Sequence, residues 1–392
     1  MEDAMTPPAT YPDAATLRQW RHDFHRHPEI AFEEHRTSAQ IIEILQAHGL
    51  EVTTGLGGGT GVVATLSGHR PGPTIGLRAD IDALPIEESN EFEHRSTIAG
   101  RMHACGHDGH TTMLLGAACA LARAPDFAGR VHFIFQPAEE SEGGARVMVE
   151  EGLFERFPME AVYGLHNWPG LPVGEAAVHD GPVMAAFDVF TLTLTGRGCH
   201  AAMPHLGSDT ILAACQLATQ LQGVISRETP AHQSAVLSIT QFHAGDAFNV
   251  LPESVELRGT VRCFDPALKA HLAKRLNEAI QAQAQFHGLA AELDHQARYP
   301  ATVNSAEHAA RCARVLEAMP AIRRVHRDLP PSMGSEDFAF MLEHCPGAYI
   351  WLGNGDSAAL HNPAYDFNDA IAPLGVAYWQ ALVRELLKPA DA

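Results

Sequence analysis

The sequence predicts an α/β fold with two domains, one built on a mostly parallel, doubly wound sheet and the other an inserted α+β domain of ferredoxin-like type. Three observations support this prediction. The chain has 392 residues, whereas a single domain usually has about 100–200. Strand and helix patterns alternate through the first half of the chain. Near residue 185 the pattern changes to strict apolar–polar alternation, which is typical of an antiparallel strand with one exposed face.

The elements of the first domain follow from periodicity and from turn residues. Residues 14–49 have apolar side chains at helical spacing and end on Gly49, so they are expected to be helical. Short apolar, β-branched runs predict strands, and runs of good helix formers predict two further helices. These strands are 60–66, 73–81, 131–136 and 161–165, and these helices are 111–124 and 145–154.

The second domain has the element order strand, helix, strand, strand, helix, strand, which is the order of a ferredoxin-like sandwich. After it, the chain returns to mixed α/β character. We therefore expect one discontinuous domain, residues 1–185 and 298–392, interrupted by an inserted domain, residues 186–297. The elements expected in the insertion are strands 187–195, 234–242, 254–264 and 289–299 and helices 208–226 and 266–287.

Composition narrows the function. The formal net charge of −20 disfavours nucleic acid and anionic membranes as partners. No apolar stretch is long enough to span a membrane, and the N-terminal residues do not have the pattern of a signal peptide. The seven cysteines are odd in number and include no CxxC pair, so a disulfide framework is not expected. We expect a cytoplasmic protein.

The strongest chemical signal is the sequence MHACGHDGH at residues 102–110. Cys105 and His107 are two positions apart, so a thiolate and an imidazole can reach one metal ion from a single turn. His103 and His110 are more often structural or outer supporting residues than ligands.

Further metal-binding side chains follow other strands. Asp80, the Glu139–Glu140 pair and His166 each come just after the expected end of a strand. In doubly wound sheets, ligands bind beyond the carboxyl ends of the strands. Three strands would therefore deliver these side chains to the same edge. One carboxylate of the Glu pair could bind metal while the other handles a proton, although most such pairs are merely solvated. His166 and His361 would each be weak evidence alone.

Seven motifs occur in a fixed order along nearly the whole chain: MHACGHD, QPAEE, GLHN, GCHAAMPH, FNVLPE, MGSEDF and LHNPAYDF. In this combination the sequence resembles the hippurate hydrolase and auxin-conjugate hydrolase branch of the aminoacylase and carboxypeptidase family of two-metal peptidases. The fold of that family, a catalytic α/β domain with an inserted dimerisation domain, agrees with the boundaries above.

The resemblance implies a ligand set and a general base. Two divalent metals would be held by five residues, Cys105, His107, Glu140, His166 and His361. Glu139 would be the general base and then the general acid. Relatives outside this branch have a His where this chain has Asp80 and a bridging Asp where it has His107. Asp80 is therefore not assigned as a ligand, and Asp82 is at most a supporting residue.

The resemblance also implies roles in the inserted domain. His200 would stabilise the oxyanion of the tetrahedral intermediate, acting in the active site of the partner subunit, so a homodimer or a dimer-based oligomer is expected. Asn249 and Arg262 would bind the carboxylate of the substrate, for which the planar guanidinium is well suited. For Arg262 a salt bridge at the strand end is an equally good interpretation, and Arg258 is a weaker alternative for the same role. Gly334 is expected to allow a close backbone approach, whereas roles for Ser335 and Glu336 stay open.

The expected function is that of a metal-dependent amidohydrolase acting on N-acetyl or N-benzoyl amino acids. The alternative among enzymes is a dipeptidase or carboxypeptidase, because the same chemistry cleaves a peptide bond. A non-catalytic, metal-dependent binding protein is disfavoured because Glu139 and all five ligands are present. Mixed Cys, His and Glu ligation suits zinc, while the resemblance favours manganese, and cobalt and nickel also fit such sites.

Overall fold

The computed structural model describes residues 12–140 and 142–389, which form two compact units. Unit 1 contains the described residues up to Gly181 together with Val303–Pro330 and the residues from Asp337 onward. Unit 2 contains Pro182–Thr302 and also Pro331–Glu336, a segment that the sequence had placed in the first domain. The functional division into a catalytic and a dimerisation domain stays a prediction.

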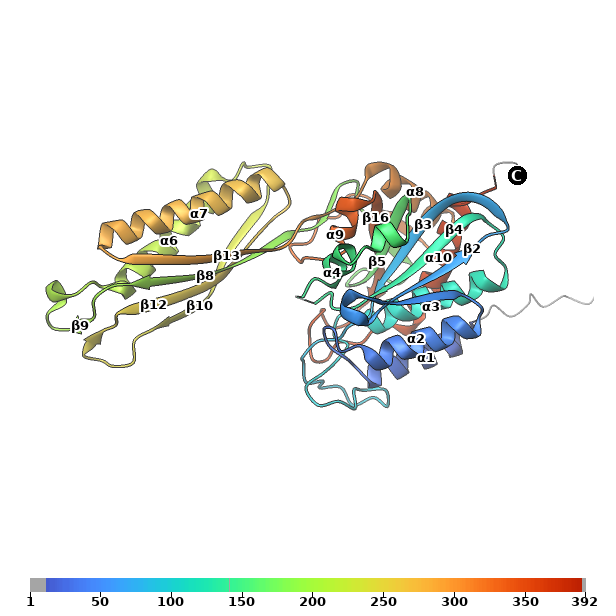
Figure 1. Ribbon diagram of the computed structural model, residues 1–392, viewed down its shortest axis with the longest axis horizontal. Helices are drawn as coiled ribbons and strands as arrows, with labels where there is room; N and C mark the ends of the chain where they lie inside the picture. The colour runs from blue at the N-terminus through green and yellow to red at the C-terminus, as the bar shows by residue number, and fades with distance from the viewer. Residues whose placement is uncertain (1–11, 141, 390–392) are drawn as a thin grey trace, which may run out of the picture. The chain divides into compact units, whose positions relative to one another are not determined.

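Unit 1 is built on an eight-stranded sheet with the order β1-β2-β4-β3-β5-β16-β6-β15 (Figure 1). Its four central strands, β4, β3, β5 and β16, run parallel, while β1, β2 and β6 introduce antiparallel pairs. The strands are β1 (Glu51–Leu56), β2 (Gly61–Ser67), β3 (Arg70–Asp80), β4 (Ala128–Gln136), β5 (Ala161–Pro169), β6 (Glu175–Val178), β15 (Arg324–His326) and β16 (Gly347–Gly355). The parallel centre confirms the predicted fold class.

The helices of unit 1 are α1 (Ala14–Arg26), α2 (His35–Ala47), α3 (His107–Arg123), α4 (Gly144–Glu150), α5 (Leu153–Arg156), α8 (Ala306–Ala318), α9 (Ala339–His344) and α10 (Ala372–Leu386), with short turns η1 (Gly57–Gly59) and η3 (Asp369–Ile371). Helix α3 packs against α1 and α10, and α4 packs against β4 and α9.

Two sequence predictions in this unit were wrong in detail. The expected helix over 14–49 is two helices, α1 and α2, because Pro28 disfavours helical backbone at His27 and ends the first one. Asp80 does not follow its strand but is the last residue of β3, and His166 lies within β5. The strand continues because His166 still pairs with Trp351 of β16, and Asn167 and Trp168 pair with the next residues.

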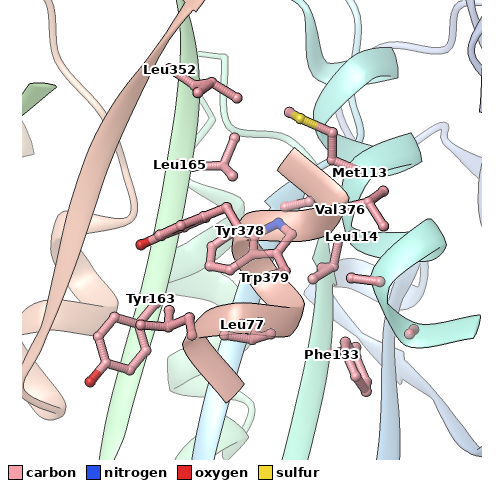
Figure 2. Packing of buried hydrophobic residues seen from close by; sticks show 14 of the residues in the cluster. Leu77, Met113, Leu114, Phe133, Tyr163, Leu165, Leu352, Val376, Tyr378 and Trp379 are labelled. Carbon is pink, nitrogen blue, oxygen red and sulfur yellow. The ribbon is translucent and has the colours of Figure 1, made fainter. Parts of the chain in front are cut away.

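The core of unit 1 lies between the sheet and a helix layer that includes α2, α3, α8 and α10, with α1 packed on α3 and α10 (Figure 2). Val131, Phe133 and Phe135 belong to this cluster, whereas the intervening Ile134 is buried outside it, as expected for side chains that alternate across a sheet. Met113 and Leu114 of α3 and Trp379 of α10 are also buried in the cluster. This packing holds the N-terminal end of α3 in place beside the carboxyl ends of β3 and β5.

Unit 2 has a four-stranded antiparallel sheet with the order β10-β12-β8-β13 and two helices. Numbered along the chain, this order is 2-3-1-4, so the predicted ferredoxin-like sandwich is present. Its elements are β8 (Ala186–Thr195), β9 (Cys199–His200), η2 (Pro204–Leu206), α6 (Thr210–Glu228), β10 (Ala235–Ala244), β11 (Val250–Leu251), β12 (Ser254–Cys263), α7 (Pro266–His287) and β13 (Ala290–Tyr299), and the short strands β7 (Pro182–Met184) and β14 (Thr302–Val303) pair beside it.

The alternating sequence of β8 gives the expected burial pattern. Phe190, Leu192 and Leu194 are buried in the core of unit 2, and the residues between them are partly exposed.

Among the residues that the structure describes, no helix combines the length and the apolar character needed to span a membrane.

We expect Trp379→Ala to lower the free energy of unfolding of unit 1 by about 3–5 kcal/mol, because it removes a fully buried side chain and leaves a cavity. Phe286→Ala, at a side chain that is 80% exposed on α7, is the control and should change it by less than about 0.5 kcal/mol. Denaturant unfolding followed by far-ultraviolet circular dichroism measures the free energy of unfolding of both variants. Equal effects of the two substitutions would contradict the described core.

Candidate metal centre

Cys105 and His107 lie on either side of Gly106 at the beginning of α3. Gly106 has a φ of 97°, a conformation that favours glycine. A Cβ atom there would lie 2.2 Å from the Oδ1 atom of Asn167, so a larger residue does not fit. The glycine thus lets the chain turn sharply and present the thiol and the imidazole from adjacent positions.

His107 is oriented by Asp82. Its Nδ1 atom lies 2.9 Å from the backbone oxygen and 3.1 Å from the Oδ1 atom of Asp82, so the Nδ1–H group donates to these acceptors. The Oδ2 atom of Asp82 accepts from the backbone N–H of Glu140 at 2.9 Å. One carboxylate therefore supports two of the predicted ligands. This leaves the Nε2 atom of His107 buried without a hydrogen-bond partner, as expected for a metal-binding imidazole.

His166 and His361 approach from other elements. The Nδ1 atom of His166 lies 2.6 Å from the backbone oxygen of Asn167, and its Nε2 atom lies 3.4 Å from the sulfur of Cys105. His361 lies after β16, where its backbone N–H donates to the oxygen of Ala104 at 2.8 Å. Its Nε2 atom lies 3.0 Å from the Oε1 atom of Glu140.

All five predicted ligands and Glu139 lie together in unit 1. Three overlapping groups each have ligand atoms within 4.8 Å of one another: Cys105, His107 and His166; Cys105, Glu140 and His361; and His107, Glu139 and Glu140. Because the groups share Cys105, His107 and Glu140, they form one continuous cluster. A sulfur, three imidazoles and a carboxylate are a donor set that suits zinc and other divalent transition metals.

The electrostatics of the cluster also fit a bound cation. Burial, together with the nearby carboxylates of Glu140 and Glu139, raises the pKa of Cys105 well above its ordinary value. Burial opposes protonation of His107, but the carboxylates of Asp80 and Asp82 raise its pKa to about 10. Protein groups alone thus keep the thiol protonated and the imidazole charged. Divalent cations among these atoms would favour the thiolate and the neutral imidazole, which are the forms that bind metal.

Asp80 is engaged in a different network. Its Oδ1 atom lies 2.6 Å from the Nδ1 atom of His110, and its Oδ2 atom accepts from Arg78 at 2.8 Å. The Nε2 atom of His110 lies 2.7 Å from the Oδ1 atom of Asn167. Asp80, His107 and His110 also form a group with metal-binding geometry. Hydrogen bonds occupy both carboxylate oxygens of Asp80, and the role of Asp80 and His110 as supporting residues stays a prediction.

Sequence reasoning missed the buried residues beneath the cluster. Arg78 donates to Gln136 at 2.7 Å and to Asp337 at 3.0 Å, and the backbone N–H of Asp337 donates to the Oε1 atom of Glu139 at 3.3 Å. The only available signal was that RAD and QPAEE end neighbouring parallel strands, whereas Asp337 is far away in the sequence.

His103 is fully buried among these elements, and burial lowers its pKa to about 4, so it is a neutral packing residue.

The predicted residues of unit 2 do not all lie together. Arg262 donates to the oxygen of Met333 and to the Oγ atom of Ser335, both at 2.9 Å, and its guanidinium stacks 4.3 Å from the ring centroid of Phe187. Among the described residues Arg262 has no acidic partner, and both of these hydrogen bonds come from the same nitrogen of the guanidinium. Arg258 instead pairs with Glu256 on the surface.

His200 and Asn249 lie at the opposite end of β12 from Arg262. Val250 of β11 pairs with His200 of β9, and the N–H of Ala201 donates to the oxygen of Asn249 at 2.9 Å. Strand β12 begins just after β11 and reaches Arg262 near its end, roughly 25 Å away for an extended strand. The Asn249 and Arg262 side chains of one chain are thus too far apart to bind the same small carboxylate.

Comparisons with known proteins identify the family of this chain. The model of peptidase family M20/M25/M40 matches residues 76–385. The chain is 37% identical to N-acetylcysteine deacetylase of Bacillus subtilis over 93% of this chain and 95% of that protein. It is 36% identical to hippurate hydrolase of Campylobacter jejuni over 94% and 96%. A crystal structure of a dinuclear metal-binding peptidase of the M20 family from Bacillus subtilis has a TM-score of 0.84 and 34% identity, covering 96% of this chain and 98% of that one.

The match of the family model to most of the chain and the identity to relatives over nearly their whole length confirm the resemblance that the seven motifs indicated. The chain belongs to peptidase family M20/M25/M40.

Proposed function

We propose that this protein is a metal-dependent amidohydrolase that releases an amino acid from its N-acyl derivative. The observation that carries the proposal is that Cys105, His107, Glu140, His166 and His361 form one cluster, in which the carboxylate of Glu139 lies beside His107 and Glu140. Similarity to a deacetylase of N-acetylcysteine and to a hydrolase of hippurate supports N-acyl amino acids as the substrate class.

The five residues would hold two divalent ions, with manganese or zinc preferred. When bound, such ions polarise the scissile carbonyl and lower the pKa of water at the site. His107 and His166 contribute preset imidazoles, because Asp82 and the oxygen of Asn167 fix which ring nitrogen faces the cluster. These two contacts hold the imidazoles of His107 and His166 in the orientation that metal binding needs.

Glu139 would move the proton. Its carboxylate is 6% exposed, and the N–H of Asp337 donates to its Oε1 atom, so the side chain is held inside the cluster rather than in solvent. It would accept the proton of the attacking water and later deliver it to the nitrogen of the leaving amino acid.

His200 would stabilise the oxyanion across a dimer interface. The N–H of Ala202 donates to its Nδ1 atom at 3.1 Å, so the neutral ring carries its proton on Nε2 and can donate it to an oxyanion. The separation of His200 and Asn249 from Arg262 within one chain supports a homodimer in which Arg262 and the partner subunit's His200 and Asn249 serve one substrate. The exposed apolar side chains of Met203, Leu206, Phe248 and Val250 near His200 fit burial in such an assembly.

Arg262 would bind the α-carboxylate of the substrate. A dipeptidase or carboxypeptidase remains the alternative function, because the metal centre can cleave any suitably placed amide and one solved relative is called a peptidase.

The seven cysteines are all free thiols, which supports a reducing, cytoplasmic location.

We expect Glu139→Gln to lower kcat by at least about 10²-fold, because the amide cannot take the proton of the water. The two metals should stay bound, as measured by elemental analysis of the purified variant. Glu150→Gln, at an exposed residue of α4, is the matched control and should retain wild-type turnover. A Glu139→Gln enzyme that keeps most of its activity would remove Glu139 from the mechanism.

Removal of metal with a chelator should abolish amine release, and reloading with manganese or zinc in separate samples should restore it. The substrates are N-acetyl and N-benzoyl amino acids and dipeptides. Full turnover by the metal-free protein would contradict a metal-dependent reaction. Faster cleavage of dipeptides than of any N-acyl amino acid would favour the alternative function.

We expect His200→Ala and Glu139→Gln variants, each nearly inactive, to regain activity when they are unfolded together and refolded as a mixture. A hybrid dimer would have one intact site, so random pairing predicts recovery of about a quarter of wild-type activity. Each variant refolded alone is the control. If the mixture stays as inactive as its components, His200 does not act across an interface.

A further inference from the structure

Three residues other than glycine have a positive φ in the part of the chain that the structure describes, and all three are near the metal centre or its support. They are Phe32 (61°), Ala138 (54°) and His361 (64°). Side chains with a Cβ atom seldom adopt this conformation, because it crowds the backbone. It persists where surrounding contacts impose it, and such positions are common at functional sites.

A single carboxylate oxygen contacts two of these three residues. The Oε1 atom of Glu34 accepts from the backbone N–H of Ala138 at 2.9 Å and from that of Phe32 at 3.1 Å. Its Oε2 atom accepts from the hydroxyl of Thr60 at 2.8 Å. The same side chain therefore joins the loop before α2, the turn before β2 and the turn after β4.

Glu34 has no part in the proposed reaction and yet is fully buried. Burial and the nearby charge of Asp82 raise the pKa of Glu34 to about 7. The fold therefore holds this carboxyl in a place where its charged form is less stable than it would be in water. Glu34 also stands at the N-cap of α2 without capping that helix. Glu29 does this instead, accepting from the N–H groups of Arg36 and Thr37.

Ala138 is the residue directly before the Glu139–Glu140 pair. Its oxygen accepts from the N–H of Gly144 at 2.9 Å, and the N–H of Glu140 donates to Asp82 at 2.9 Å. The turn is thus fixed on its far side independently of Glu34. The φ of Ala138 helps to set the direction in which the following Glu139 leaves this turn, and the Glu139 carboxylate also accepts from the N–H of Asp337 at 3.3 Å.

We propose that Glu34 is a positioning residue that holds Ala138 in its left-handed conformation and thereby aims the carboxylate of Glu139 into the metal centre. This inference rests on the proposed role of Glu139. Without the acceptor, Ala138 relaxes toward negative φ and Glu139 turns away from the attacking water. Glu140 keeps its anchor on Asp82, so the metals stay bound.

The test compares Glu34→Ala and Glu34→Gln in the full-length, metal-loaded enzyme. Glu34→Ala should lower kcat by about 10–100-fold with a small change in KM, as expected for a misplaced catalytic group. Glu34→Gln retains an acceptor oxygen for both N–H groups, and the Thr60 hydroxyl can accept from its amide, so kcat should stay within about threefold of wild type. Glu34→Met fills the same volume without an acceptor and replaces Glu34→Ala if that variant does not fold.

Ala138→Gly provides the decisive comparison, because glycine adopts positive φ without the steric penalty. Alone it should change kcat little. The double variant that combines it with Glu34→Ala should have a kcat at least about tenfold higher than that of Glu34→Ala alone. A general loss of stability would not be reversed in this way. The proposal is overturned if Glu34→Ala keeps kcat within twofold of wild type, or if the double variant is as slow as Glu34→Ala.

Glu29→Ala is the matched control, since it removes a nearby carboxylate that also accepts from two backbone N–H groups but does not contact Ala138. It should lower stability while leaving kcat unchanged. Hydrogen exchange of the Ala138 amide separates this inference from the proposed function: protection should be lost in Glu34→Ala and kept in Glu29→Ala, even if wild type hydrolyses no N-acyl amino acid. Unchanged protection of Ala138 in Glu34→Ala would refute the contact itself.

Discussion

The metal centre depends on the burial of ionisable side chains at the carboxyl edge of the eight-stranded sheet. Removing such groups from water costs several kcal/mol each unless partners compensate. Here Asp82 contacts both His107 and the backbone N–H of Glu140, and the backbone oxygen of the neighbouring Asn167 orients His166. The parallel alignment of β3, β4 and β5 makes this arrangement possible, because it brings their carboxyl ends to one place.

Beneath the ligands lies a second layer that contains no assigned ligand. Arg78 contacts both Asp80 and Asp337, and Asp337 in turn contacts Gln136 and the N–H of Ala145. This layer connects the strand ends with the segment before α9. The buried guanidinium of Arg78 offsets the negative charge of these two buried carboxylates beside the candidate metal centre.

The two units divide the proposed work. Unit 1 contains the cluster of ligands and the general base, whereas unit 2 carries the groups that would recognise the substrate carboxylate and the oxyanion. In unit 2 the long strand β12 separates Arg262 from the β9–β11 pair that carries His200 and Asn249. This spacing gives a physical reason for a homodimer, because one chain alone does not bring these side chains together.

The sequence by itself determined the fold class and the family, because periodicity and the seven motifs can be recognised locally. The resemblance implied the five-residue ligand set, and the structure brings these five side chains together. The sequence placed His166 after its strand, because the end of a strand is decided by pairing with its neighbour, here β16. It also joined α1 to α2, because the helical periodicity on both sides hid the helix end that Pro28 causes. Only the tertiary structure decided the supporting contacts. Asp337 lies 198 residues from Glu139, and Glu34 lies 104 residues from Ala138. Such pairs follow no periodicity, because they form only when distant segments pack around the same buried charges.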